Sequence, residues 1–263
     1  MFELFRATIR LILFFIISLL VATSITVGNF LLKIFSTHWA VVWKNKVMRS
    51  WAFVASWIIG LRIEVEGPEP DCPFLLVSNH LSYVDPLLFW RYLDATFVAK
   101  SEIKSWPFFG WGAREAGVLF INRELRKDVH RMNHRISECI TENQGVILFP
   151  EGTSTKGAEV LPFNTSLLQY SIDAELPVHY ATISYKAQPP WKSHLDVCWW
   201  GDMSFFSHFW KLLKMPGFKA FVTFGDKTIS AQDRKILAEK LQKAVADQFT
   251  PVRSKSYHDY RRY

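Results

Sequence analysis

The sequence predicts an α/β protein with a mostly parallel central sheet flanked by helices, and an apolar, membrane-associated helical segment at its N-terminus. After Gly67, short apolar runs alternate with segments of helical periodicity, which predicts crossover connections between parallel strands. Most of these runs are continuously apolar, as is typical of strands buried on both faces. Residues 11–32 contain no charged side chain, and as a helix they measure about 33 Å, enough to cross a hydrocarbon core.

The composition narrows the class of protein further. Of the 263 residues, 49% are hydrophobic and 16% aromatic, which excludes a disordered chain and indicates a membrane interface. A net charge of +7 suits anionic lipids, phosphate-bearing substrates or nucleic acid. Because no nucleic-acid motif accompanies that charge, we expect no nucleic-acid partner. The three cysteines lie far apart, which excludes a disulfide scaffold and a cysteine zinc site and fits a reducing compartment.

The N-terminal segment is predicted to hold the chain at a membrane. Positive side chains flank the apolar run on both sides, with Arg6 and Arg10 before it and Lys33, Lys44, Lys46 and Arg49 after it. The run is long for a signal peptide and lacks a clear small-x-small cleavage site. Charge on both sides permits either a spanning helix, with its C-terminal side cytoplasmic, or a hairpin dipped into one leaflet.

Two further amphipathic stretches have two possible environments each. One face of a helix would carry Trp43, Val47, Trp51, Val54 and Ile58, which favours an interfacial helix, with a core helix of the α/β domain as the alternative. The apolar stripe within residues 199–215 leaves the same two alternatives. We expect three regions: an anchoring helical segment at 1–62, an α/β domain at 63–250 and a basic tail at 251–263.

The elements of the α/β domain follow from the apolar runs in chain order. Strands are predicted at residues 74–78, 95–99, 117–121, 145–149, 177–184, 195–200 and 218–224. Helices are predicted at residues 86–92, 126–142, 165–174, 205–214 and 231–247. Ligands of open α/β sheets bind beyond the carboxyl ends of the strands, so the polar residues that follow each strand are the candidates for a site.

His80 and Asp85 follow the first of these strands. An imidazole accepts a proton at neutral pH, and a carboxylate on its other nitrogen fixes the tautomer and stabilises the imidazolium. Five residues apart across a strand-to-helix turn, the two side chains can meet. The alternatives are that Asp85 caps the helix that begins at Pro86 and that His80 is a half-buried structural histidine.

Two later strand ends carry groups suited to an anion. Arg123 presents a planar guanidinium that fits phosphate oxygens, although it can also pair with Glu124 or Glu115. The Gly152-Thr153 turn can present backbone N–H groups and a hydroxyl, or be an ordinary turn. Glu151 can orient Arg123 or the turn.

These three loops resemble the motifs of one family. Residues 79–85 (NHLSYVD) resemble the first motif of the glycerolipid acyltransferases, residues 120–123 (FINR) the second and residues 149–153 (FPEGT) the third. Order and spacing match over about residues 70–200, and the apolar N-terminal end is also similar. The family includes the bacterial PlsC-type 1-acyl-sn-glycerol-3-phosphate acyltransferases.

The resemblance implies a membrane-bound enzyme of phospholipid biosynthesis at the cytoplasmic side of a bacterial inner membrane. It would transfer a fatty acyl group from acyl carrier protein or coenzyme A to a lysolipid hydroxyl, in the first place that of 1-acyl-sn-glycerol-3-phosphate, giving phosphatidic acid. No cofactor beyond the acyl thioester co-substrate is expected, and no metal. The catalytic residues would be His80, as general base, and Asp85. The substrate-binding residues would be Asn122, Arg123, Glu151, Gly152 and Thr153.

Two departures from the family pattern leave the acceptor open. Ser154 stands where many members have arginine, and residues 177–180 supply one proline where two are usual. The chain is also similar to members that acylate lyso-ornithine or other amino-acid lipids. A non-catalytic lipid-binding protein is an alternative from another class. Metal-dependent phosphate-ester hydrolysis through His80, Asp85 and Glu151 is a third, and it needs more ligands than these loops offer.

Overall fold

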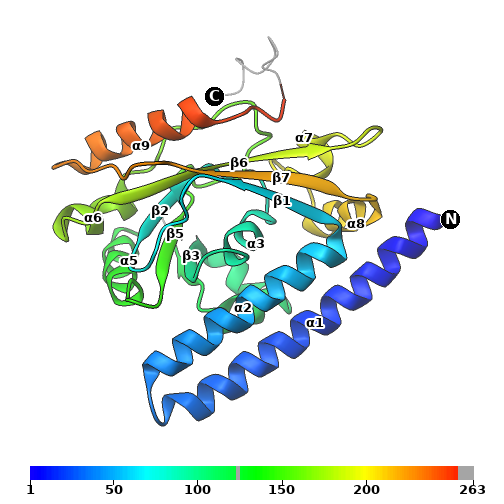
Figure 1. Ribbon diagram of the computed structural model, residues 1–263, viewed down its shortest axis with the longest axis horizontal. Helices are drawn as coiled ribbons and strands as arrows, with labels where there is room; N and C mark the ends of the chain where they lie inside the picture. The colour runs from blue at the N-terminus through cyan, green and yellow to red at the C-terminus, as the bar shows by residue number, and fades with distance from the viewer. Residues whose placement is uncertain (123–124, 254–263) are drawn as a thin grey trace.

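The central sheet determines where everything else lies. A computed structural model describes residues 1–122 and 125–253, and within them seven strands form one sheet in the order β1-β7-β6-β2-β5-β3-β4 (Figure 1). The strands are β1 Leu61–Glu66, β2 Leu75–Ser78, β3 Ala95–Lys100, β4 Leu119–Ile121, β5 Gly145–Leu148, β6 Val178–Ala187 and β7 Phe218–Phe224. Neighbouring strands run parallel except β6 and β7, which are antiparallel, so the predicted mostly parallel sheet is confirmed.

Helices cover both faces of the sheet. The α-helices are α1 Phe2–Lys33, α2 Thr37–Ile59, α3 Asp85–Trp90, α4 Phe109–Glu115, α5 Arg126–Cys139, α6 Gln169–Asp173, α7 Ser193–Asp196, α8 Phe205–Lys214 and α9 Arg234–Gln248. Short 3₁₀ helices occupy Ser101–Ser105 and Ser166–Leu168. One apolar core joins a sheet face to α2, α3 and α8, and the second joins the opposite face to α5 and α9.

The extent of burial explains which strands could be predicted from the sequence. β2 and β5 are buried at every position and read as continuous apolar runs. β1 alternates between covered and exposed residues, and it was not among the predicted strands. It pairs with β7 at the sheet edge, where one face meets the core and the other does not, so its short alternating pattern is a weaker signal.

One predicted strand is wrong. Residues 195–200 do not join the sheet, since α7 ends at Asp196 and Val197 and Cys198 are fully buried beside the loop that follows β2. A continuously buried apolar run reads the same whether it is a strand or a packed irregular segment. Helix α4 was also not predicted.

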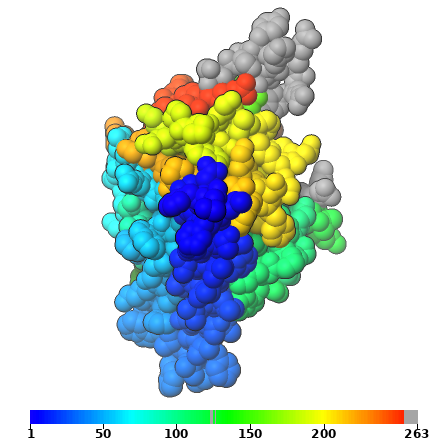
Figure 2. All heavy atoms as spheres, turned by 90° about the vertical axis from the view of Figure 1, so that its right-hand side faces the viewer, coloured from blue at the N-terminus to red at the C-terminus, as the bar shows by residue number. Residues whose placement is uncertain are grey.

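The N-terminal segment forms a helical hairpin. α1 and α2 lie antiparallel beside each other, and α1 also contacts α4 and α8 (Figures 1 and 2). The tryptophan face of α2 turns towards α1, because Trp51 Nε1 donates to Ser18 Oγ at 3.0 Å and Trp43 Nε1 to the Ser24 carbonyl at 3.3 Å. That face is therefore mainly an internal contact. The stripe of α8 is likewise core, with Phe209, Leu212 and Leu213 buried, while Phe206 remains exposed.

Among the described residues, α1 carries most of the large apolar side chains that stay exposed. Within the described residues it is the one helix long and apolar enough to cross a membrane by length and composition. Large apolar side chains stay exposed along it from Phe2 to Leu31. α2 leads through Gly60 directly into β1, so the predicted division after residue 62 falls within this strand.

Two arginines fasten the start of α1 to the end of α8. Arg6 donates to the Lys214 carbonyl, and Arg10 donates to the carbonyls of Met215 at 2.5 Å and Pro216 at 3.1 Å. The last carbonyls of a helix have no partner within it, and a cation there also suits the helix dipole. The hairpin is thus held by polar contacts as well as by apolar packing.

We expect Arg10→Ala to weaken this attachment. Loss of charge-assisted hydrogen bonds at a partly exposed site costs about 1–2 kcal/mol, or about 3–6 °C in melting temperature. Thermal unfolding in detergent micelles and hydrogen exchange of the first α1 turns measure the effect. Lys33→Ala is the control, because it removes a positive charge from the other end of α1. An equal loss of melting temperature in both variants would contradict a specific attachment of α1 to the end of α8.

Candidate active site

His80 and Asp85 meet at the carboxyl end of β2, as predicted. His80 lies in the loop after Ser78, and Asp85 is the first residue of α3. The Nδ1 atom of His80 is 2.7 Å from Oδ2 of Asp85. Asp85 is fully buried, whereas the His80 side chain is 22% exposed. The pair therefore joins a buried carboxylate to an imidazole that reaches the surface.

Asp85 organises the whole loop around it. Its Oδ2 also accepts the backbone N–H groups of Leu81 at 2.7 Å and Ser82 at 3.0 Å. Its Oδ1 accepts the hydroxyl of Tyr185 at 2.6 Å. The carboxylate thus turns back into its own loop and does not cap α3 with its side chain. A buried carboxylate is costly unless donors satisfy it, and here four donors do so.

Tyr185 is a site residue that sequence reasoning missed. It comes from β6, 100 positions beyond Asp85, and its hydroxyl is the donor to Oδ1. Burial and the neighbouring Asp85 carboxylate raise the pKa of Tyr185 well above its ordinary value, so the hydroxyl keeps its proton. Residues 181–185 of β6 are all buried, and a buried tyrosine hydroxyl needs a hydrogen-bond partner, which was the available signal.

The hydrogen bonds determine the tautomer of His80. Because the Asp85 carboxylate is an acceptor, the proton of the neutral imidazole lies on Nδ1. This leaves Nε2 with a lone pair on the other side of the ring. The ring stacks on Phe149, with centroids 4.3 Å apart and planes inclined by 16°. A ring held by one hydrogen bond and one stacking contact is oriented as a general base requires.

Glu151 ties the third motif to the first. Its Oε1 accepts the backbone N–H of His80 at 2.8 Å, and its Oε2 accepts that of Leu161 at 3.0 Å. Thr155 N–H donates in turn to the His80 carbonyl at 3.0 Å. Burial raises the pKa of Glu151 to about 8, against the opposing effect of the two N–H donors. Glu151 therefore positions the His80 backbone.

The Gly152-Thr153 turn lies beside this contact. Gly152 has a φ of 76°, in the left-handed region that favours glycine, and its N–H donates to the Phe149 carbonyl at 3.0 Å. That N–H is thus used within the turn. Thr153 is exposed, which leaves its side chain accessible from solvent.

The second motif lies further along the sheet. Asn122 follows β4, and strand β3 separates β4 from β5, the strand that carries Phe149 at its end. The backbone N–H of Asn122 donates to Oδ2 of Asp128 at 2.7 Å. Arg123 lies outside the described residues, so its predicted role as an anion ligand stays a prediction.

Other polar side chains of the first motif form hydrogen bonds that stabilise the fold. The fully buried Ser82 donates its hydroxyl to the Val197 carbonyl at 2.7 Å, which does not suit a nucleophile. Asn79 exchanges two hydrogen bonds with the backbone of Ile183 in β6. The structure gives the metal-dependent alternative no support. N–H and O–H donors occupy the oxygens of Asp85 and Glu151, and in residues 1–122 and 125–253 no three His, Cys, Asp or Glu side chains are grouped to hold a metal ion.

One cavity lies beside this site and another lies away from it. A cavity of about 120 Å³ next to Phe149 is lined by Val98, Ile121, Val129, Leu148, Pro150, Asn164, Ser166 and Leu167. It can hold a few methylene groups. The other cavity, about 590 Å³, lies at the C-terminal end of β6. None of the residues that line it belongs to the three motifs.

The fold and this geometry define an α/β protein with a carboxylate-oriented histidine at the carboxyl ends of parallel strands. Comparison with known proteins gives the family. Residues 62–186 match the family model described as Acyltransferase. The chain is 30% identical over 190 residues to the 1-acyl-sn-glycerol-3-phosphate acyltransferase of Neisseria gonorrhoeae, covering 71% of this chain and 73% of that one.

Further relatives agree. A lyso-ornithine lipid O-acyltransferase of Pseudomonas aeruginosa is 30% identical over 209 residues, covering 77% of this chain and 78% of that one. The crystal structure of the 1-acyl-sn-glycerophosphate (LPA) acyltransferase PlsC from Thermotoga maritima matches with a TM-score of 0.59 at 20% identity, over 92% of this chain and 97% of that one, and shows the same fold. The chain therefore belongs to the acyltransferase family and is an acyltransferase of the lysophospholipid type.

We expect Tyr185→Phe to lower kcat about tenfold with little change in KM. The change removes one donor from Asp85 in a buried site, which weakens the orientation of His80 and costs about 1–3 kcal/mol of stability. Steady-state kinetics and thermal unfolding measure the two effects. Tyr180→Phe on the same strand is the control. Unchanged kcat in the folded Tyr185→Phe variant would remove this hydroxyl from the site.

The raised pKa of Glu151 predicts a pH dependence of stability. The folded state holds the proton up to about pH 8, whereas the ordinary pKa is 4.5. The folded chain therefore binds more protons between these values, so the contribution of Glu151 to stability is greatest below pH 4.5 and falls as the pH rises to 8.

Glu151→Gln removes this titration while keeping the shape of the side chain. From pH 5 to pH 8.5, we expect the melting temperature of the wild type to fall relative to that of Glu151→Gln by roughly 5–10 °C. Other titrating groups cancel in the difference between the two proteins. A wild type that gains stability relative to the variant over this range would mean that Glu151 is ionised in the fold.

Proposed function

We propose that this acyltransferase moves a fatty acyl group from an acyl thioester to the hydroxyl of a membrane lysolipid, with His80 as general base. The observation that carries the proposal is the His80–Asp85 pair, with Nδ1 bound to the buried carboxylate and the ring partly exposed. The hydroxyl is activated only if Nε2 accepts its proton, and Nε2 is the nitrogen left with a lone pair.

The proposed acyl transfer needs no acyl-enzyme intermediate. Nε2 takes the proton from the acceptor hydroxyl while the oxygen attacks the thioester carbonyl carbon. The C–S bond then breaks, the acyl group remains on the oxygen as an ester, and the thiolate takes the proton from the imidazolium. The Asp85 carboxylate stabilises that imidazolium during the step. Proximity of acceptor and donor supplies much of the remaining rate.

The acceptor we propose is 1-acyl-sn-glycerol-3-phosphate, which gives phosphatidic acid. Two relatives that are both 30% identical to this chain are named for different acceptors, one for 1-acyl-sn-glycerol-3-phosphate and one for lyso-ornithine lipid. Ser154, at a position where many family members have arginine, favours the amino-acid lipid as the second candidate. The predicted anion ligand Arg123 favours a phosphate.

The membrane is the source of the acceptor. The exposed apolar side of α1 supports insertion of the hairpin into the membrane, which would hold His80 where a lysolipid diffuses in two dimensions. We propose that the site lies on the cytoplasmic side, because acyl carrier protein and coenzyme A thioesters are cytoplasmic and acidic, and a basic chain attracts them.

The test is a panel of acceptors and donors with two histidine variants. We expect the His80→Ala variant to lose a factor of about 10²–10⁴ in kcat while its melting temperature is retained. The control is His134→Ala, an exposed histidine on α5, which should keep full activity. Near-normal turnover by His80→Ala would overturn the proposed mechanism. A wild type that binds lysolipid but consumes no thioester would be a lipid-binding protein.

The same panel separates the two acceptors. Membranes that contain the chain are assayed with lysophosphatidate and with lyso-ornithine lipid, each with acyl carrier protein and coenzyme A donors. If lysophosphatidate is the acceptor, Arg123→Ala should raise its KM, because a group that binds ground and transition states alike acts first on KM. Activity confined to lyso-ornithine lipid would give the second candidate.

A further inference from the structure

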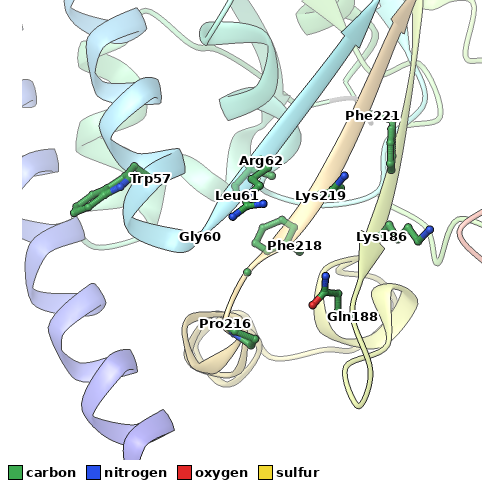
Figure 3. A pocket seen from close by; sticks show the side chains of 11 residues that line it. Trp57, Gly60, Leu61, Arg62, Lys186, Gln188, Pro216, Phe218, Lys219 and Phe221 are labelled. Carbon is green, nitrogen blue, oxygen red and sulfur yellow. The ribbon is translucent and has the colours of Figure 1, made fainter.

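A second cavity of the described residues lies away from His80. It measures about 590 Å³ and opens where β1 and β7 begin and β6 ends (Figure 3). Its lining comes from the end of α2, the start of β1, the end of β6 and the segment between α8 and β7. No residue of the three motifs borders it, so the acyl-transfer site does not account for it.

The cations that line the cavity lie on the face of the sheet opposite to His80. Successive side chains of a strand point to opposite faces. Tyr185 points towards Asp85, so the next residue of β6, Lys186, points to the other face. Lys186 lines the cavity (Figure 3). A ligand held by these cations cannot present a thioester or a hydroxyl to His80 through the sheet.

Three cations stand in a row across three neighbouring strands in this cavity. Arg62 of β1 pairs in register with Lys219 of β7, and Lys219 pairs in register with Lys186 of β6. Like charges directly opposite each other destabilise a sheet. Glu64 compensates one of them through an ion pair with Lys219 at 2.6 Å. Elsewhere in residues 1–122 and 125–253, no acidic group forms an ion pair with Arg62 or Lys186.

The rim of the cavity is apolar and adjoins the membrane hairpin. Trp57, at the end of α2, is 75% exposed, and Pro216 and Phe221 add further apolar surface. Arg10 of α1 lies against Gly60, another lining residue, where a Cβ would be 2.7 Å from the guanidinium. The cations are accessible to solvent, with Arg62 and Lys186 exposed and Lys219 44% exposed. A hollow lined by accessible cations, with a tryptophan at its edge and an exposed apolar helix beside it, has the layout of a headgroup site at a membrane interface.

We infer that this cavity binds the phosphate headgroup of an anionic membrane phospholipid, with its acyl chains directed past Trp57 along the hairpin. The phosphate would meet Arg62 and Lys186, which have no carboxylate partner among the described residues. It would offset the repulsion along the row, as anionic lipids do at basic clusters next to membranes. The lipid would therefore fix the orientation of the sheet relative to the bilayer.

An acidic carrier protein is the less suitable occupant. A carrier docked on these cations would leave its thioester on the wrong face for His80, as the alternation of Tyr185 and Lys186 shows. Free phosphate shares the headgroup chemistry but makes no use of the apolar rim. Both occupants become outcomes of the experiment.

The experiment measures binding of dihexanoylphosphatidylglycerol to the detergent-solubilised full chain by calorimetry. This probe is anionic but is not the product of the proposed reaction. We expect saturable binding by the wild type and a Kd at least tenfold higher for Arg62→Gln/Lys186→Gln. Trp57→Ala should also weaken binding. Because the double variant removes repulsion, its melting temperature should not fall, and its acyl transfer in detergent should match the wild type.

The control removes the same charge from another surface. Lys235→Gln/Lys240→Gln changes two exposed cations of α9 and should leave the Kd within twofold of the wild type. If the double cavity variant does not fold, Arg62→Gln and Lys186→Gln are measured singly, with an increase in Kd of at least threefold expected for each.

Several results would overturn the inference. Absence of binding by the wild type, equal losses in the two double variants, or equal affinity for dihexanoylphosphatidylcholine would exclude a specific anionic headgroup site. Inorganic phosphate that binds as tightly as the lipid, with no effect of Trp57→Ala, would show a soluble phosphate site. Holo-acyl carrier protein that displaces the lipid and loses affinity in the cavity variant alone would show protein docking instead.

Discussion

The buried carboxylate of Asp85 is the constraint on which the rest of the site depends. Four donors meet it: the imidazole of His80, two backbone N–H groups of its own loop and the hydroxyl of Tyr185. A buried charge without such partners would cost several kcal/mol, so the loop after β2 and the inner face of β6 can each adopt only an arrangement that supplies them. The orientation of the imidazole follows from this constraint.

Strand order then decides which loops cooperate. β2 and β5 are neighbours, so the loops that follow them exchange the contacts of Glu151 and Thr155 with the His80 backbone. The Asn122 loop stands at the far edge beyond β3. The proposed chemistry at His80 and the proposed binding by the second motif would therefore use separate parts of one surface, which suits an acceptor with a reacting hydroxyl and a distant headgroup.

The sequence alone predicted the fold class and the meeting of His80 with Asp85, because continuous burial and a five-residue turn are local signals. It could not predict Tyr185, whose partner lies 100 positions away and becomes near only through the pairing of β6 with β2. The prediction of a strand at residues 195–200 was wrong. In the structure the Val197 carbonyl accepts a hydrogen bond from the Ser82 hydroxyl, and the Trp199 N–H donates to the Leu81 carbonyl. The pattern of apolar residues shows which side chains are buried. It does not show the backbone conformation, because a strand and an irregular segment can bury the same side chains.

The direct passage from α2 through Gly60 into β1 has a practical consequence. Gly60 adopts a φ of 75°, and a Cβ there would lie 2.9 Å from the Pro216 carbonyl, so neither a longer side chain nor a spacer fits at this junction. The helical hairpin is thus not a detachable module. Exchanging hairpins between related enzymes, or trimming this one to obtain a water-soluble catalyst, would disturb the sheet edge and has to be designed together with β1 and β7.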